Sequence, residues 1–443
     1  MIEPGFFNKI YYRIPFSILV PLFFIVLIGI INLASAAQAT RPDLYLSQMT
    51  KFGFAFFLMT ILSFINTRMI KRASFFVYAA AIFLLLLVLV VGTSAKGAQR
   101  WLVLGAFRLQ PSDPAKLAVI LAIARYCSLY WPQKGYTLLS LLKPLNLSRP
   151  IGVMLLLIGF LIKSSHSDSF LSDFLSDQFL TSNIGIGLML GILCGWLIWL
   201  FLCFVSLGKN GLNFSIFIAP IDIAIVPFLL VAVEPDLATG IIILSICAIM
   251  FLYVGISRSS LLIGFIAFIF IATGAYFTVL KDYQKQRIVS FLNQEADLQG
   301  DGYQAMQSII AIGSGKAIGK GFSGGTQTQL SFLPENSTDF AFSVWAEEWG
   351  FLFCVFLLFL YFLVITACLK ICLKTSDKFS QLICVGVAAN IFVHVMVNIG
   401  MVTGILPVAG VPLLLISYGG SAMTTSMLSL GLVVNVCLWR TAK

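Results

Sequence analysis

Long apolar runs, separated by short polar stretches, recur along most of the 443 residues of this chain. A helix needs about 20 predominantly apolar residues to cross a bilayer, and by that criterion the pattern predicts roughly twelve spans. The predicted spans are Phe16–Ala37, Phe52–Thr67, Ser74–Gly92, Pro114–Tyr130, Pro150–Ile162, Asn183–Leu207, Ser215–Val233, Leu237–Gly255, Ser259–Leu280, Ala341–Leu369, Phe379–Val402 and Val408–Leu438. The first span is too long for the apolar core of a cleaved signal peptide, about 7–15 residues, so we expect it to be retained. The pattern predicts an all-α polytopic membrane protein that forms one domain over residues 1–443.

One long polar stretch, from Gly302 to Gly350, interrupts this pattern. Gly, Ser, Thr, Gln and charged residues collect there, and Ser337-Thr338-Asp339 leads into the next apolar run. The glycine-rich part, Gly313–Gly325, lacks the GKS or GKT ending of a Walker phosphate-binding loop. Glycine-rich backbone is typical of segments that close over a site. We therefore expect Gly313–Gly325 to be a flexible loop over a cavity, not a nucleotide site.

The composition supports a membrane protein and excludes other classes. The chain is 59% hydrophobic and 10% charged, whereas soluble domains carry roughly a quarter charged residues. The net charge of +10 does not indicate nucleic-acid binding, because the Lys and Arg residues lie in short loops and not in a patch interleaved with aromatic residues. The 9 cysteines show no CxxC spacing and the chain has 2 histidines, so no metal site of Cys and His is expected.

The charges of the connecting stretches predict how the chain is oriented in the membrane. Cytoplasmic loops of membrane proteins are enriched in Lys and Arg. With the N-terminus inside, the inner loops and the C-terminus hold Arg68, Lys71, Arg72, Lys134, Lys143, Arg149, Lys209, Arg258, Lys370, Lys374, Lys378, Arg440 and Lys443. The outer loops then include the acidic segment Ser164–Asn183 and the stretch Gly302–Gly350. Both termini are therefore predicted to be cytoplasmic, and the long polar stretch external.

Ionisable residues within or at the edges of spans are costly and are functional candidates by default. The candidates all fall on the predicted external side, and they are Arg100, Asp113, Lys116, Glu234, Asp236, Asp339, Glu347 and Glu348. This one-sided distribution predicts an external cavity that holds a polar substrate.

Position alone leaves two interpretations open for each of the main candidates. Asp339 precedes a predicted helix, so it is either an N-cap or first-turn acid or a carboxylate base at the mouth of a cavity. Asp236 is either the cap of the helix from Leu237 or a substrate ligand. Arg100 and Lys116 either bind an anionic headgroup such as a diphosphate or act as an interfacial cation and as the partner of Asp113, three residues away on one helix face.

Glu347 and Glu348 lie eight and nine residues beyond Asp339, inside the same predicted helix. Burying a carboxylate without a partner is costly. We therefore expect at least one of the two to face protein and to pair with a cation.

Several motifs, in the same order along the chain, resemble those of the SEDS family of bacterial cell-wall polymerases. They are KGAQRW at Lys96–Trp101, QPSDPAK at Gln110–Lys116, EPDLAT at Glu234–Thr239, YQAMQS at Tyr303–Ser308, AIGSG at Ala311–Gly315, GKG at Gly319–Gly321, GTQTQLSFLPENSTDF at Gly325–Phe340, EEWG at Glu347–Gly350 and LPVAGVPLLLISYGGS at Leu406–Ser421. The first and last are more similar to the elongation (RodA) branch of the family than to its division (FtsW) branch.

The resemblance implies a GT-C-like helical bundle of ten spans, with both termini cytoplasmic. Residues 150–207 would then be a two-span insert, and residues 281–340 a large external loop that carries the catalytic motif. It implies a multi-pass protein of the bacterial cytoplasmic membrane, a peptidoglycan glycosyltransferase that polymerises lipid II on the outer face during cell elongation. Its partners would be a class B penicillin-binding transpeptidase and other elongation-complex proteins.

The family's essential carboxylate matches Asp339, which would act as the general base. The family's other cavity residues match Arg100, Asp113, Lys116, Asp236 and, in the external loop, Arg287. A divalent cation such as Mg²⁺ or Mn²⁺ would suit a diphosphate substrate, but the sequence does not demand one.

The chain departs from the family pattern at three positions. Ser337 replaces the usual His before TDF, Asp113 stands in PSD where PSE is usual, and Glu234 stands in EPDLAT where QPDLGT is usual. These replacements remove the His before TDF, draw the Asp113 carboxylate back by one methylene and add a charge at Glu234.

Two other classes of function compete with the enzyme. A lipid II flippase or transporter should show internal repeats and charges deep in its spans, whereas the candidate charges here cluster externally. A non-catalytic scaffold for the transpeptidase would not need Asp339.

Overall fold

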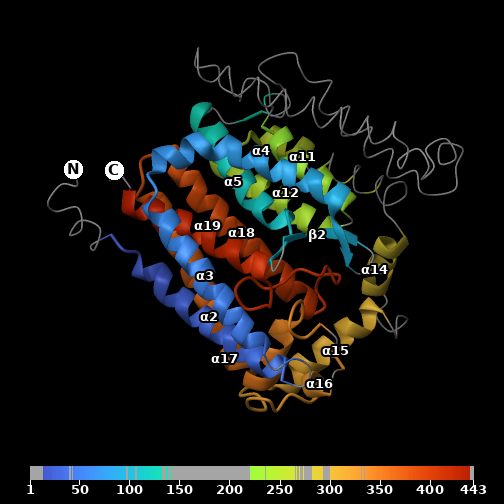
Figure 1. Ribbon diagram of the computed structural model, residues 1–443. Helices are drawn as coiled ribbons and strands as arrows, with labels where there is room; N and C mark the ends of the chain where they lie inside the picture. Colours follow the sequence, from blue (N-terminus) through green and yellow to red (C-terminus); the bar gives the residue numbers. More distant parts are fainter. Residues whose placement is uncertain are drawn as a thin grey trace, which may run out of the picture.

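A computed structural model shows a bundle of helices with a small sheet at one end (Figure 1). It describes residues 13–38, 41, 43–95, 98–104, 107–131, 136–137, 140, 220–234, 236–264, 266, 269, 273, 282–292, 300–330, 332–333 and 335–439. Among these residues, 7 helices are long and apolar enough to cross a membrane. They are α2 (Phe16–Ala36), α3 (Leu44–Phe64), α4 (Thr67–Val91), α12 (Leu237–Val254), α17 (Ala341–Leu373), α18 (Lys378–Val402) and α19 (Gly420–Trp439).

Two further predicted spans coincide with α5 (Ser112–Leu129) and α11 (Asp222–Val233). Helix α5 contains Asp113, Lys116 and Arg125, but it is almost wholly enclosed by other helices. Packing against α4, α12 and α18 thus keeps its polar residues away from lipid. The predicted spans Pro150–Ile162 and Asn183–Leu207, the predicted insert 150–207 and most of Ser259–Leu280 lie outside the described residues.

The prediction of a helix over Val408–Leu438 is wrong in its first part. Residues 403–419 form an irregular segment, which we call the 403–419 loop, and α19 begins only at Gly420. Pro407 and Pro412 lack the amide hydrogen that a helix needs, and Gly404 and Gly410 adopt positive φ angles of 75° and 65°. The apolar side chains here, such as Val411 and Leu413, are buried in protein, which explains why hydropathy alone suggested a span.

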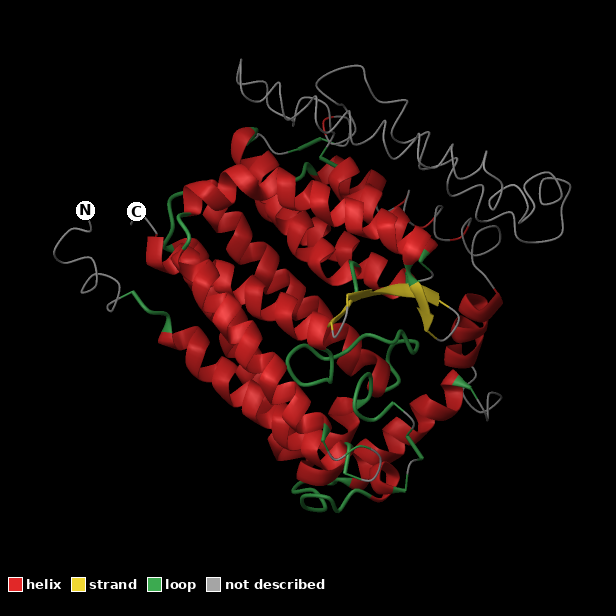
Figure 2. Cartoon of the chain, in the orientation of Figure 1, coloured by secondary structure: helices red, strands yellow, loops and turns green. Residues whose placement is uncertain are grey.

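Both ends of the described chain lie at the same end of the bundle (Figure 1). Arg13 Nη1 donates to the Leu438 carbonyl at 3.2 Å, and the Asn435 side chain donates to the carbonyl of Ser63, in the last turn of α3, at 3.0 Å. The loops and the sheet gather at the opposite end (Figure 2). The two termini therefore share a face, and the identity of that face as cytoplasmic stays a prediction.

Three short strands modify the all-α prediction. β1 (Thr93–Ala95), β2 (Ala98–Leu104) and β3 (Phe107–Leu109) form an antiparallel sheet in the order β1-β2-β3. In its register Thr93 faces Trp101, and Leu102 faces Leu109. Side chains alternate along β2, with Leu102 buried and Val103 exposed, as expected for a sheet with one covered face. The sheet carries Arg100 to the end of the bundle where α5 begins.

The stretch predicted as one external loop, 281–340, contains three helices. They are α14 (Asp282–Leu292), α15 (Asp301–Ser314) and α16 (Thr326–Gln329). Gly313–Gly325, expected to be a flexible cover, is instead packed in part against the first turns of α17. The amides of Lys320 and Gly321 donate to the carbonyls of Glu347 and Glu348 at 3.1 and 2.8 Å.

Helix α17 is broken at Gly350, whose φ is 73°. Beyond the break, the amides of Phe351 and Leu352 donate to the carbonyls of Lys316 and Ala317 at 2.8 and 3.1 Å. Residues 316–321 therefore satisfy the main-chain groups that the break releases. The result is a short first segment, residues 341–349, which we call the half-helix, followed by a long membrane-crossing segment.

Replacing Gly350 by Ala is expected to destabilise the protein. The positive φ alone costs a non-glycine residue about 1–2 kcal/mol, and a Cβ atom would also collide with the main chain of Gly319. Thermal unfolding in detergent should show a lower midpoint. Gly53→Ala in α3 is the control, because nothing lies within 4 Å of a Cβ atom there. Equal midpoints for the two variants would contradict this account of the break.

Candidate active site

Asp339 lies in a tight turn, residues 335–340, that leads into the half-helix. The amides of Thr338 and Phe340 both donate to the Glu335 carbonyl at 3.2 Å. The helix begins at Ala341 with Phe340 in the N-cap position, so Asp339 lies one residue before the cap and is half-buried. Asp339 therefore does not occupy the N-cap position itself, and its role as a base stays a prediction.

Helices α2 and α15 hold the start of the half-helix by hydrogen bonds. These contacts also fix the turn 335–340, which precedes the half-helix. Asn32 Nδ2 of α2 donates to the Ala341 carbonyl at 2.8 Å. The hydroxyl of Ser308 in α15 lies 2.7 Å from that of Ser343 and donates to the Val402 carbonyl. These buried hydrogen bonds connect the start of the half-helix to three other helices, since Val402 ends α18.

The 403–419 loop lies beside the turn that carries Asp339. The Tyr418 amide donates to the Ser337 carbonyl at 2.9 Å. At Gly410 the main chain passes so close that an added Cβ atom would lie 3.5 Å from Asp339 Oδ2. A side chain at Gly410 would therefore contact the carboxylate.

Lys51 of α3 anchors the end of the same loop. Its Nζ donates to the Tyr418 hydroxyl at 2.7 Å and lies 4.1 Å from the centre of the ring. Burial would raise the pKa of Tyr418, but the hydrogen bonds from Lys51 and Ser47 outweigh it and hold this pKa below its usual value. The loop is thus fixed both to α3 and to the turn of Asp339.

Arg100 and Asp236 belong to one cluster where β2 meets the start of α12. Arg100 Nε donates to the Glu234 carbonyl at 3.1 Å. Asp236 Oδ2 accepts from Gln110 Nε2 at 3.1 Å, and Oδ1 accepts from the Thr239 amide at 3.4 Å. The predicted capping role of Asp236 is therefore confirmed, and its second oxygen is available to orient Gln110.

Asp113 and Lys116 form the ion pair that their spacing allowed. Asp113 Oδ1 lies 2.9 Å from Lys116 Nζ, with both side chains buried. Lys116 Nζ also lies 3.2 Å from Nε2 of His394 on α18. An ammonium group can only donate, so Nε2 must accept and His394 must be the neutral tautomer with its proton on Nδ1. An ammonium has three hydrogens, so Lys116 retains one beyond these two contacts.

Asp113→Asn is expected to cost more stability than Lys116→Met. Breaking a buried pair costs about 3–5 kcal/mol, but Asp113 lies in the first turn of α5, where the helix dipole favours a lone acid and disfavours a lone ammonium. Thermal unfolding of the purified variants should therefore rank Asp113→Asn lowest and the wild type highest. A Lys116→Met variant that is the less stable of the two would contradict this ranking.

Arg287 lies beside the 403–419 loop. It lines a hollow together with Ser290 of α14, Ala305 of α15 and Pro407. Pro407 belongs to the loop that also reaches Asp339. The hollow therefore places Arg287 beside the same loop.

Glu347 is the acid that pairs with a cation, as expected for one of the two glutamates. It is fully buried, and its Oε1 lies 2.7 Å from Lys320 Nζ. The Gln327 amide and the Thr328 hydroxyl also donate to its carboxylate at 3.1 and 2.9 Å. Glu348 accepts a hydrogen bond from Ser35 of α2. Glu347 thereby attaches residues 320–328 to the half-helix.

The residues described do not fit a metal site of their own. Among them, no three His, Cys, Asp or Glu side chains are grouped to hold an ion. The carboxylates of Asp113 and Asp236 are engaged by Lys116 and Gln110.

The bundle and its seven apolar helices define a multi-pass membrane protein with a polar site at one end. The sequence matches the profile of the cell cycle protein family FtsW/RodA/SpoVE over residues 12–167 and 205–441. The chain therefore belongs to this family, whose members are the SEDS proteins.

Similar proteins include two that carry the name peptidoglycan glycosyltransferase. MrdB of Escherichia coli K12 is 35% identical over 383 residues, which cover 86% of this chain and 81% of MrdB. RodA of Treponema pallidum is 32% identical over 402 residues, covering 88% and 89%.

Two solved structures share the fold. One comes from a study of the "structural coordination of polymerization and crosslinking by a peptidoglycan synthase complex"; it has a TM-score of 0.67 at 26% identity and covers 95% of this chain and 97% of its own. Thermus thermophilus RodA has a TM-score of 0.58 at 23% identity, with 97% and 98% covered.

Sequence reasoning missed three residues of the site. Gln110 contacts Asp236, His394 contacts Lys116, and Asn398 contacts the main chain of Asp339. His394 and Asn398 were detectable, because two polar side chains four residues apart in an apolar span share one helix face and need partners.

Proposed function

We propose that this protein is a peptidoglycan glycosyltransferase that polymerises lipid II at the outer face of the cytoplasmic membrane during cell elongation. The observation that carries the proposal is the position of Asp339, half-buried at the polar end of the bundle and beside the main chain of Gly410. MrdB and RodA match this chain over most of its length, and both are named peptidoglycan glycosyltransferases, which supports the same activity here.

In the proposed reaction Asp339 is the general base. A sugar hydroxyl of the acceptor attacks the anomeric carbon of the donor, and its proton passes to the Asp339 carboxylate. The bond from that carbon to the lipid diphosphate breaks with inversion, and the diphosphate leaves with the electron pair. A carboxylate within hydrogen-bond reach of the attacking hydroxyl can perform this step. The half-helix and the 403–419 loop hold the carboxylate in place for it.

Arg100, Lys116, Asp113, Asp236 and Arg287 are the proposed substrate-binding residues. The planar guanidinium of Arg100 suits phosphate oxygens, and the third hydrogen of Lys116 can donate to the same charge as it grows. Asp113 orients Lys116, and Asp236 orients Gln110. Arg287 lines the hollow beside the 403–419 loop, where it can contact a second anionic group. If a divalent cation joins the diphosphate, it would neutralise that charge.

The proposed partner is a class B penicillin-binding transpeptidase within a larger elongation complex. The support is the structural likeness to the protein from the peptidoglycan synthase study. Such a partner would cross-link the strands that this chain makes.

The experiment is reconstitution of the full protein, with and without the transpeptidase, in vesicles that contain fluorescent lipid II. Polymerisation predicts labelled glycan strands that grow with time. Movement of intact lipid II across the bilayer without any polymer would overturn the proposal in favour of a transporter. If no polymer formed and no lipid II crossed the bilayer, but the protein still bound and stimulated the transpeptidase, the result would favour a scaffold.

A further inference from the structure

Asn398 joins the two main-chain segments that meet at the candidate base. It lies on α18 and is fully buried. Its Nδ2 donates to the Asp339 carbonyl at 2.9 Å and to the Val411 carbonyl at 2.7 Å. A carboxamide nitrogen has two hydrogens, so each of them serves one of the two segments.

These two carbonyls belong to the two main-chain segments that lie beside the Asp339 carboxylate. One belongs to Asp339 itself, and the other follows Gly410, the residue whose main chain flanks Asp339 Oδ2. Both segments are irregular, so no helix ladder fixes the distance between them. The carboxamide of Asn398 provides a fixed link from a regular helix to both.

The same face of α18 also reaches the Asp113–Lys116 pair. His394 lies one turn before Asn398, and its Nε2 lies 3.2 Å from Lys116 Nζ. Most of α18 is enclosed by other helices. Helix α18 therefore connects the Asp113–Lys116 pair, through His394, with Asp339, through Asn398.

We propose that Asn398 is a positioning residue that holds Asp339 against the 403–419 loop at the distance the reaction requires. This inference rests on the proposed glycosyltransferase function. Asn398 acts through Asp339, so its removal should slow the chemical step and leave lipid II binding almost unchanged. A displacement of a reacting group by about 1 Å can cost on the order of a hundredfold in rate.

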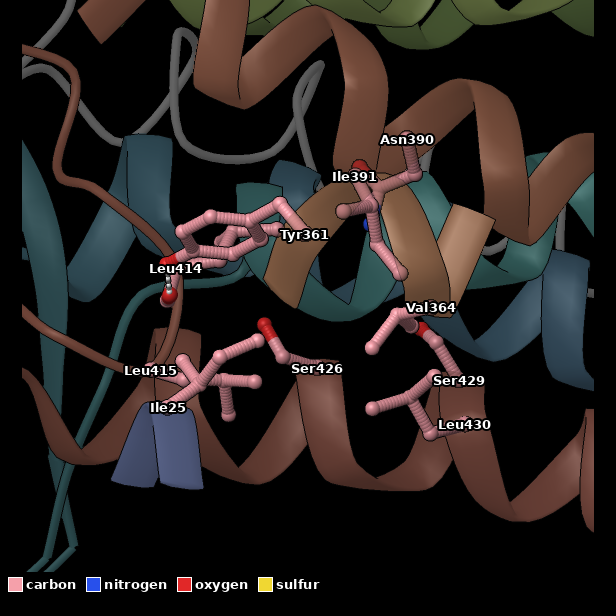
Figure 3. A pocket seen from close by; sticks show the side chains of 10 residues that line it. All are labelled: Ile25, Tyr361, Val364, Asn390, Ile391, Leu414, Leu415, Ser426, Ser429 and Leu430. Carbon is pink, nitrogen blue, oxygen red and sulfur yellow. Dashed lines mark hydrogen bonds between the residues drawn. The ribbon is translucent and has the colours of Figure 1, made fainter. Parts of the chain in front are cut away.

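Asn390 provides a matched control on the same helix. It is also buried, but it lies two turns from Asn398 and lines a small cavity with Ile25, Tyr361 and Ser426 (Figure 3). Its carboxamide oxygen has no hydrogen-bond partner within the described part of the chain. Asn390→Ala therefore removes the same chemical group from the same helix without touching the turn of Asp339.

The test compares Asn398→Ala and Asn390→Ala in polymerisation of labelled lipid II by the full protein with its transpeptidase. For Asn398→Ala the maximal rate should fall about ten- to a hundredfold, while the half-saturating lipid II concentration stays within about twofold. Asn390→Ala should keep the wild-type rate. A wild-type rate for Asn398→Ala, or an equal loss for Asn390→Ala, would overturn the proposal. A wild-type protein that makes no polymer would instead overturn the proposed function.

Hydrogen exchange provides a readout that does not depend on activity. Asn398→Ala should speed amide exchange in residues 335–341 and 411–418. Asn390→Ala should leave exchange in residues 335–341 unchanged; residues 335–341 are the discriminating segment, because Leu414 and Leu415 also line the cavity of Asn390. If Asn398→Ala does not fold, Asn398→Ser takes its place, because a hydroxyl has one hydrogen and can serve at most one carbonyl. If the Asn398 variant exchanged its amides in both segments at the wild-type rate, the proposal would be overturned.

Discussion

Asp339→Asn is expected to lower the polymerisation rate by a factor of about 10² to 10⁴, the usual contribution of a general base. The carboxamide has nearly the same shape, so the turn 335–340 and its contacts with Tyr418 and Asn398 should persist. It cannot accept the proton of the attacking hydroxyl. Lipid II should therefore still bind with nearly wild-type affinity, and the loss should appear in the maximal rate.

Asp43→Asn is the matched control for this substitution. Asp43 is exposed, and its side chain makes no capping hydrogen bond at the start of α3. Removal of its charge should leave the rate unchanged. If Asp339→Asn polymerised as fast as Asp43→Asn in folded protein, Asp339 would not be the base.

Glu347→Leu is expected to have the largest effect on folding. The Glu347 carboxylate accepts from Lys320, Thr328 and the Gln327 amide. Leucine would leave these donors unsatisfied together, at about 1–3 kcal/mol for each that stays buried. The segment before α17 would then separate from the half-helix, so both the unfolding midpoint and the polymerisation rate should fall.

Two further variants test that interpretation of Glu347. Lys320→Met should cost less than Glu347→Leu, because the neutral donors Gln327 and Thr328 still reach the carboxylate. Glu348→Gln, at the next residue, should be milder again, because a carboxamide oxygen can also accept the hydrogen bond that the Ser35 hydroxyl donates. Thermal unfolding of all three variants measures the order. A Glu347→Leu protein as stable as Glu348→Gln would show that this cluster does not hold the half-helix.

The membrane helices were predictable because a helix that crosses the bilayer needs about 20 predominantly apolar residues. The predicted start of the first span coincides with that of α2, and the predicted Leu237–Gly255 differs from α12 by one residue. The 403–419 loop was missed because burial in protein requires the same apolar residues as burial in lipid. Pro407, Pro412 and Gly410 were the available signal.

The site was only partly predictable, because its contacts join residues far apart in sequence. The spacing of Asp113 and Lys116 predicted their pairing, and Asp236 was recognised as a helix cap. No local pattern could place His394 beside Lys116 or Asn398 beside Asp339. Likewise, the break at Gly350 depends on a second segment, residues 316–321, that supplies hydrogen bonds across it. Such pairings are set by tertiary packing and not by propensity.

The most direct test of the account measures both products of the reaction at once. Wild-type protein and Asp339→Asn, at equal concentrations of folded protein, are given labelled lipid II, and the disaccharides joined are counted together with the lipid diphosphate released. The account predicts that the wild type releases one diphosphate lipid for each disaccharide added, and that Asp339→Asn produces both more slowly by the same large factor. Equal rates for the two proteins, or glycan growth without release of diphosphate lipid, would contradict it.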